Sequence, residues 1–116
     1  MKLICILLLS FVAVLPAQQI IRSFDAPDSG ISGLAYYDNS LYAVGANSKT
    51  VYVLDEMSGS VNNSWTVSTT GTETPTGIGY AGNLLYVGAD DGSGNSGHVY
   101  KYTTSGSYQG SSDVLC

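Results

Sequence analysis

The feature that most constrains this chain is an internal repeat. Residues 33–42 read GLAYYDNSLY and residues 77–86 read GIGYAGNLLY, so five of the ten positions match at an offset of 44. The match continues, with a slip of one residue, as Val44-Gly45-Ala46 against Val87-Gly88-Ala89, and resumes as Val51-Tyr52 against Val99-Tyr100. A period of 44 to 48 residues is typical of similar structural units that stack and cover one another.

Each unit contains four short runs of β-branched and aromatic residues between clusters of Gly, Asn, Asp and Ser, which predicts strands joined by turns. The expected strands are residues 34–37, 41–45, 51–54 and 61–67 in the first unit, and 78–81, 84–88, 98–102 and 108–114 in the second. Asp38-Asn39 and Gly82-Asn83 tolerate the positive φ of a tight hairpin. We therefore expect an all-β fold of two four-stranded antiparallel blades of β-propeller type, residues 33–67 and 77–114.

A ninth run of strand-forming residues, Ile20 to Phe24, precedes the first unit. Its position relative to the first unit matches the position of the first unit's last strand relative to the second unit. It is expected to be an orphan outer strand whose three inner partners lie elsewhere. Propellers close their ring in this way, which removes an exposed strand edge. Residues 18–116 are thus predicted to be the N-terminal part of a longer propeller. Two blades leave two faces open, so we expect the isolated chain to fold poorly or to self-associate. The alternative is a six-bladed ring made of three copies of the chain. That ring would need only eight strands from each copy, whereas nine are predicted here.

The first 17 residues are predicted to be a secretory signal peptide. A charged start is followed by a 13-residue apolar run, Leu3 to Leu15, broken only by Ser10, and then by Pro16-Ala17. That run is shorter than the roughly 20 apolar residues that span a bilayer as a helix. The mature chain is expected to begin near Gln18, to lack a membrane span, and to be secreted, either extracellular or periplasmic.

Charge and cysteine content exclude two classes of protein. Loss of Lys2 with the signal leaves three basic residues against nine acidic ones, a surface that repels phosphate backbones. Nucleic acid is therefore not expected as a partner. Cys5 lies within the signal, so Cys116 has no intramolecular partner and the mature chain is not a disulfide-stapled domain.

The second unit resembles the blade consensus of secreted bacterial propellers of the streptogramin-lyase-like and gluconolactonase-like kind. The resemblance extends over almost all of the mature chain and implies the propeller fold. It implies little about activity, since the family includes lactonases, lyases, glutaminyl cyclotransferase-like enzymes and binding proteins. No catalytic motif of these enzymes can be placed on this sequence. The resemblance rests on Pro75-Thr76-Gly77-Ile78, Tyr80, Leu85 to Gly88, Val99 to Thr103 and Gly106.

In a propeller, the loops before first strands and those between second and third strands share one face of the ring. Carboxylates and an imidazole on one face are the minimum for metal binding or acid–base chemistry. The matching loop of the first unit, residues 47–50, has no acid or His, so the more economical interpretation is solvated loop residues. The residues placed on that face are Asp28, Glu73, Asp90, Asp91 and His98.

The loop that follows the second strand of the second unit is a candidate calcium site. Asp90, Asp91 and Asn95 supply closely spaced oxygens among flexible glycines, as a hard cation requires. The distal bidentate Glu of a helix-flanked calcium loop is absent, and the same residue types occur in any long hairpin loop. The alternative is therefore an ordinary loop.

Six tyrosines recur at equivalent positions, and we expect their rings to fill the space between stacked units, with carbohydrate binding as the alternative. They are Tyr36, Tyr42, Tyr52, Tyr80, Tyr86 and Tyr100.

The sequence favours a noncatalytic extracellular binding or surface module whose partner is a protein or a glycan. The alternative is part of a secreted propeller enzyme, a lactonase or lyase, whose channel metal is held by acids from several blades. The binding module and the enzyme are distinguished by whether further blades supply acids equivalent to Glu73 and Asp90.

Overall fold

The computed structural model describes residues 23–93 and 96–115. The predicted signal peptide with Cys5, residues 20–22 of the orphan strand, Asn95 and Cys116 lie outside the described residues. Ser23 and Phe24, the remaining residues of that predicted strand, have irregular backbone. No helix in the described part of the chain is long and apolar enough to cross a membrane.

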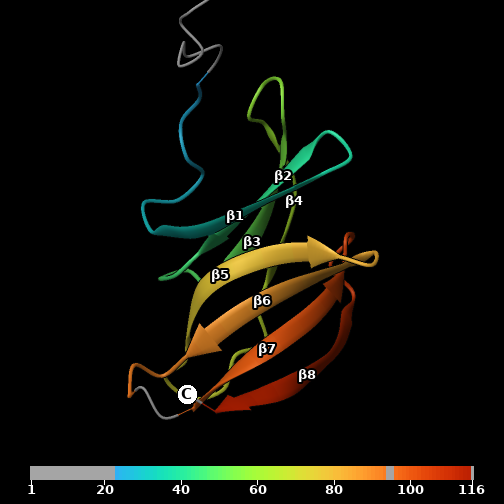
Figure 1. Ribbon diagram of the computed structural model, residues 1–116. Helices are drawn as coiled ribbons and strands as arrows, with labels where there is room; N and C mark the ends of the chain where they lie inside the picture. The colour runs from blue at the N-terminus through green and yellow to red at the C-terminus, as the bar shows by residue number, and fades with distance from the viewer. Residues whose placement is uncertain (1–22, 94–95, 116) are drawn as a thin grey trace, which may run out of the picture.

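The described chain forms two four-stranded antiparallel sheets, which confirms the all-β prediction (Figure 1). Within each sheet the strands lie side by side in chain order, so each strand pairs with the next one along the chain. The first sheet contains β1 (Ile31–Tyr37), β2 (Ser40–Gly45), β3 (Thr50–Asp55) and β4 (Val61–Thr66). The second contains β5 (Thr74–Ala81), β6 (Leu84–Asp90), β7 (Ser96–Thr103) and β8 (Tyr108–Leu115).

The first hairpin of each sheet turns as the sequence predicts. Asp38 and Asn39 have φ of 49° and 62°, and Gly82 and Asn83 have φ of 55° and 70°. Two successive residues with positive φ match the right-handed twist of the flanking strands, and Asn, Asp and Gly accept that conformation at the lowest cost.

Strand register corrects the slip expected between the repeats. Gly33 lies opposite Val44 and Gly77 lies opposite Gly88, with an irregularity just before each glycine. Val44 therefore corresponds to Gly88 and not to Val87. The offset of 44 runs through the first hairpin of each sheet, and the inserted residues lie between Ala89 and His98, in the β6–β7 loop and the strand ends beside it. Alignment by residue identity placed the slip here because the dipeptide Val-Gly occurs one residue earlier in the second unit than in the first.

The two sheets stack by opposite faces. We call the face carrying Leu41 or Leu85 the Leu face of its sheet, and the face carrying Tyr42 or Tyr86 the Tyr face. The Tyr face of the first sheet packs on the Leu face of the second, with β5 against β1 and β2. The core between them consists of Tyr42, Val44, Val51, Val53, Val67, Leu85, Val87, Ala89, Tyr100 and Tyr102.

This stacking explains which recurrent tyrosines are buried. Tyr42 and Tyr100 lie in the core, as predicted, and Tyr80 packs against its edge. Tyr36, in contrast, is 54% exposed, because it lies on the Leu face of the first sheet, which has no sheet packed on it. Tyr52 and Tyr86 are only partly buried for the same reason.

The sheets approach most closely at a pair of glycines. A Cβ atom added to Gly33 would lie 2.8 Å from the Gly77 Cα atom and 2.9 Å from the Ile78 nitrogen. Both contacts are with backbone, which cannot rotate away as a side chain does. Position 33 is therefore restricted to glycine by the neighbouring sheet and not by its own backbone conformation, since its φ is not positive.

We predict that Gly33→Ala lowers the free energy of unfolding by about 1–3 kcal/mol, the usual cost of overpacking a tight interior. Gly79→Ala is the matched control: it changes a glycine of β5 whose added Cβ meets no described atom within 4 Å. The control should be neutral or slightly stabilising, because alanine is less costly than glycine within a strand. Urea unfolding of dilute protein measures both, and equal losses would contradict the close-approach explanation.

Candidate functional site

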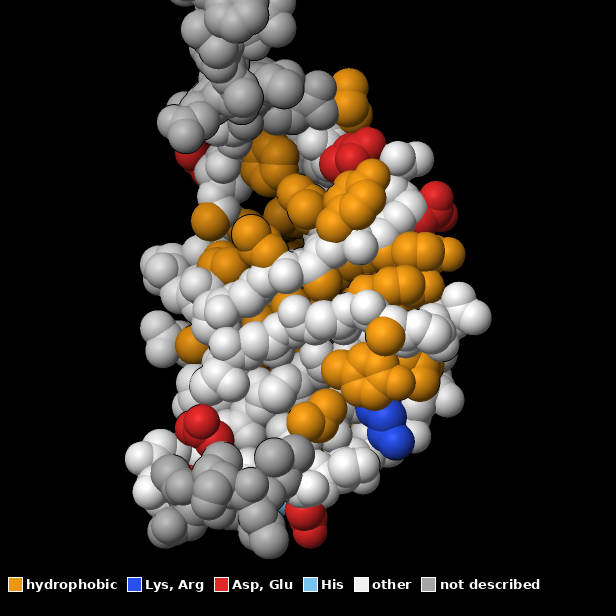
Figure 2. Space-filling view, in the orientation of Figure 1, with side chains coloured by type: hydrophobic (Ala, Val, Ile, Leu, Met, Phe, Trp, Pro, Cys, Tyr) orange, Lys and Arg blue, Asp and Glu red, His pale blue; other side chains and the backbone are white. Residues whose placement is uncertain are grey.

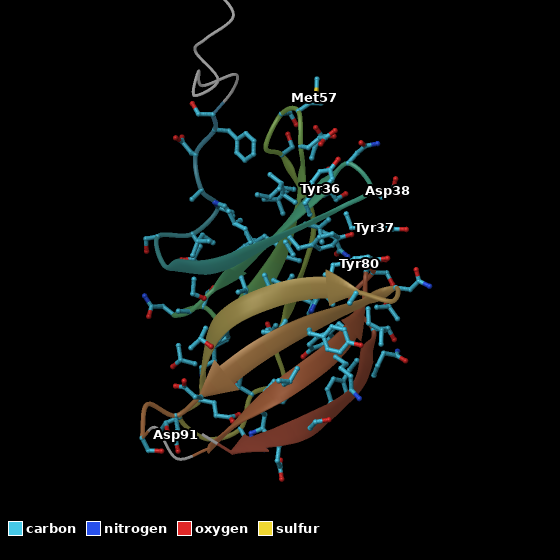
Figure 3. The ribbon with its side chains drawn as sticks, viewed as in Figure 1. Tyr36, Tyr37, Asp38, Met57, Tyr80 and Asp91 are labelled. Carbon is cyan, nitrogen blue, oxygen red and sulfur yellow. The ribbon has the colours of Figure 1, made fainter. Side chains whose placement is uncertain are left out.

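The candidate residues lie at one end of both sheets, which we call the loop end. Thr74 pairs with Asp90 and Ala89 pairs with His98, so the segment after Glu73 meets the β6–β7 loop there. Asp28 precedes β1 at the corresponding end of the first sheet, where Ile31 pairs with Gly45. Asp91 follows β6 at the same end (Figure 3).

Glu73 is the centre of the site. Its side chain is buried, with the residue only 5% exposed, whereas Asp28 and Asp90 are half-buried and Asp91 is exposed. One carboxylate oxygen, Oε1, accepts hydrogen bonds from the Tyr100 hydroxyl and from the backbone N–H and Oγ1 of Thr70, both Thr70 distances being 3.0 Å. The other, Oε2, contacts His98 Nδ1. Burying a carboxylate is costly unless it is paired in this way.

His98 joins Glu73 to the outer strand. Its Nδ1 contacts Glu73 and its Nε2 lies 2.9 Å from Asp113 Oδ1 on β8. Asp113 is 83% exposed at its side chain, so the chain of contacts runs from the interior to solvent. With a carboxylate on each ring nitrogen, both nitrogens are positioned to donate, which is the hydrogen bonding of the imidazolium form.

The environment separates the pKa values of the two groups. Burial raises the pKa of Glu73, but the hydrogen bonds from Tyr100, His98 and Thr70 outweigh burial and lower it to about 2. The hydrogen bond to Glu73 raises the pKa of His98 above its ordinary value, and the charge of Asp113 adds to this. The site therefore favours the protonated form of His98 and the ionised form of Glu73.

Asp28 makes a related arrangement in the first sheet. It accepts hydrogen bonds from Ser48 Oγ, from the Gly30 N–H at 3.1 Å and from the Tyr52 hydroxyl at 3.1 Å. The bonds from Ser48 and Gly30 lower its pKa. Tyr52 corresponds to Tyr100, so in both units a tyrosine of the third strand donates to a carboxylate that precedes the first strand.

The calcium hypothesis stays a hypothesis. Asp90 Oδ1 accepts from the Gly92 N–H at 3.0 Å, and Asp91 Oδ1 accepts from the N–H and hydroxyl of Ser93 at 2.9 and 2.6 Å. These bonds are internal to the loop, and Asn95 lies outside the described residues. Across residues 23–93 and 96–115, no three His, Cys, Asp or Glu side chains gather in a way that would hold a metal ion.

Sequence reasoning singled out Glu73 and His98 but missed Thr70, Tyr100 and Asp113. Tyr100 is two residues from His98, so both point to one face of β7, a signal that strand alternation supplies. Asp113 is the cross-strand partner of His98, which only the β7–β8 register reveals. No family model matches the chain, and no curated protein matches it either.

We predict that Glu73→Gln lowers the free energy of unfolding at pH 7 by about 1–3 kcal/mol, because buried donors lose a charged acceptor. The folded pKa of about 2 lies below the ordinary 4.5, so this contribution is present above pH 4.5 and is lost as the pH falls toward 2. The difference in the free energy of unfolding between wild type and variant, measured by urea unfolding, should become smaller over that pH interval. A gap independent of pH would show that the charge of Glu73 contributes nothing.

A second prediction concerns the His98 imidazole, whose titration can be followed by NMR. Its pKa should lie above 6.5, so its contribution to stability is present below pH 6.5 and is lost as the pH rises through the folded pKa. Glu73→Gln should lower that pKa more than Asp113→Asn does, since Glu73 is the main cause of the shift. The reverse order would assign the shift to the exposed acid instead.

Proposed function

We propose that this protein is a noncatalytic extracellular binding or surface module built from propeller-type repeats. The observation that carries the proposal is a division between the two ends of the sheets. At the loop end, the groups suited to chemistry bond to one another. At the opposite end, which we call the hairpin end because the turns Asp38-Asn39 and Gly82-Asn83 lie there, aromatic rings are exposed.

The pairing at the loop end argues against acid–base catalysis by His98. A general base needs a free ring nitrogen within reach of substrate, whereas both nitrogens of His98 face carboxylates of the same chain. The low pKa of Glu73 likewise makes it a poor acid or base near neutral pH. These contacts instead hold the β4–β5 connection against β7 and β8. The alternative, part of a secreted lactonase or lyase with a channel metal, requires its acids to come from further blades.

The hairpin end has the properties of a binding surface. Tyr37 stacks on Tyr80 with ring centroids 4.0 Å apart and planes 14° apart, which joins the first hairpins of the two sheets. Tyr36 and Tyr37 are both exposed, and Figure 3 shows them beside Tyr80 at this end. Hydrophobic side chains gather over the same region in Figure 2.

Exposed tyrosines suit a partner that offers both apolar surface and hydroxyl groups. Their rings give contact area at little cost in side-chain entropy, and tyrosine is enriched in the residues that dominate binding energy. The amides of the adjoining Asn39 and Asn83 supply polar contacts, and the Tyr80 hydroxyl already donates to Asn83 Oδ1 at 3.2 Å. A glycan or a polar protein surface fits this chemistry.

The proposal is tested by screening the secreted protein against a glycan array and a panel of extracellular proteins, and then comparing variants on the ligand found. Tyr37→Ala should weaken binding about tenfold or more, the effect of losing a dominant aromatic contact of about 1.4 kcal/mol or more. His98→Gln, which changes a residue of the loop end, should bind as wild type.

Two results would contradict the proposal. The first is binding that is lost in His98→Gln but kept in Tyr37→Ala. The second is turnover of lactone substrates that Glu73→Gln abolishes, which would support the enzyme alternative.

A further inference from the structure

The stacking of the two sheets leaves one face of each sheet uncovered, and the two uncovered faces differ. The first sheet is covered on its Tyr face and the second on its Leu face. The Leu face of the first sheet and the Tyr face of the second therefore have no described sheet packed on them (Figure 1). They are the same two kinds of face that meet inside the molecule.

Two tyrosines of the covered faces have tyrosine counterparts on the uncovered faces. Tyr52, on the uncovered Leu face, is the counterpart of Tyr100, which is buried in the covered Leu face. Tyr86, on the uncovered Tyr face, is the counterpart of the buried Tyr42. Each of these tyrosines is thus buried in the unit where a neighbouring sheet is present and only partly buried in the unit where it is not.

The glycines of β5 add an independent observation. Gly77 and Gly79 lie on the uncovered Tyr face, opposite Gly88 and Tyr86. Neither has positive φ, and a Cβ added to either meets no described atom within 4 Å. Neither the backbone nor the packing of this chain requires glycine there. The counterpart of Gly77 is Gly33, which must be glycine because another sheet lies against it.

The uncovered Leu face of the first sheet is apolar and hollowed. Leu34, Leu41, Ala43 and Leu54 line a cavity of about 400 Å³ on this face, and Leu34 is 62% exposed. The segment Ser23–Pro27 crosses the face without forming a strand and leaves the hollow visible in Figure 2. Leu85 is fully buried by the first sheet, whereas its counterpart Leu41 is only partly buried. Ala43 and Leu54 are already buried within the chain.

From this we propose that a second copy of the chain stacks on the first, with the Tyr face of one copy's second sheet against the Leu face of the other copy's first sheet. The contact joins the same two kinds of face as the interface inside each molecule, with Gly77 in the role of Gly33 and with Gly88 and Lys101 in the places of Val44 and Val53. Ser23–Pro27 leaves the Leu face of the receiving copy. The proposal is independent of the ligand bound at the hairpin end.

Such a contact joins two unlike faces, so it is heterologous. Each added copy presents a new free Tyr face, and assembly continues until a ring closes or a filament forms. A symmetric dimer, in which one face pairs with itself, does not follow from this geometry. The distinction gives the experiment its readout.

Two variants each block one face. Gly77→Val adds side-chain volume at the close-approach point of the Tyr face, where the separate chain has open space and a β-branched residue suits a strand. Leu34→Glu places a charge on the Leu face at an exposed position. Ser111→Val is the matched control for added volume, since it lies opposite Tyr100 and so on the other face of the second sheet.

Sedimentation velocity of the purified chain over a range of concentrations tests the proposal. Wild type and Ser111→Val should form species larger than dimers as concentration rises, and each blocking variant alone should stay monomeric. A mixture of Gly77→Val and Leu34→Glu should form a one-to-one dimer and nothing larger, because each variant retains the face that the other lacks.

Three results would overturn the proposal: wild type that is monomeric at every concentration, single variants that still dimerise, or a mixture that stays monomeric. Melting temperatures close to wild type show that the variants fold. Gly79→Val, on the same face as Gly77, replaces Gly77→Val if that variant is unstable.

Discussion

The contact of Gly33 with the backbone of Gly77 and Ile78 is the constraint on which the rest of the structure depends. It allows β1 and β5 to approach closely enough for the Tyr face of one sheet to pack on the Leu face of the other. Ten buried residues of the core follow from that approach. Any side chain at position 33 would push the sheets apart and weaken packing throughout an interior that has the density of a crystal.

The stack also places the chemistry-bearing residues. Because β1 and β5 run side by side in the same direction, the segments that precede them carry Asp28 and Glu73 to the same end of the molecule. There a tyrosine of each third strand donates to the carboxylate. The recurrence of this pair in both units indicates that it fastens the connection leading into each sheet. His98 and Asp113 extend the arrangement to the outer strand in the second unit alone.

The two ends of the sheets differ in the side chains they present. At the loop end, Glu73, His98 and Tyr100 satisfy one another's polar groups by hydrogen bonds within the chain. The hairpin end instead exposes rings that its own core does not need. In the function and the stacking proposed above, the hairpin end serves recognition and the two uncovered faces join copies of the chain.

The sequence by itself determined the all-β class, the two units, the strand order and the positive-φ hairpins, because turn residues and alternation act over a few residues. It also indicated that Glu73 and His98 share an end. Only the tertiary structure decided that Val44 corresponds to Gly88, that Tyr36 is exposed while Tyr100 is buried, and that Asp113 completes the His98 site. These depend on cross-strand register and on which face meets another sheet. Both are contacts between residues distant in the chain, so the local pattern of either unit cannot specify them.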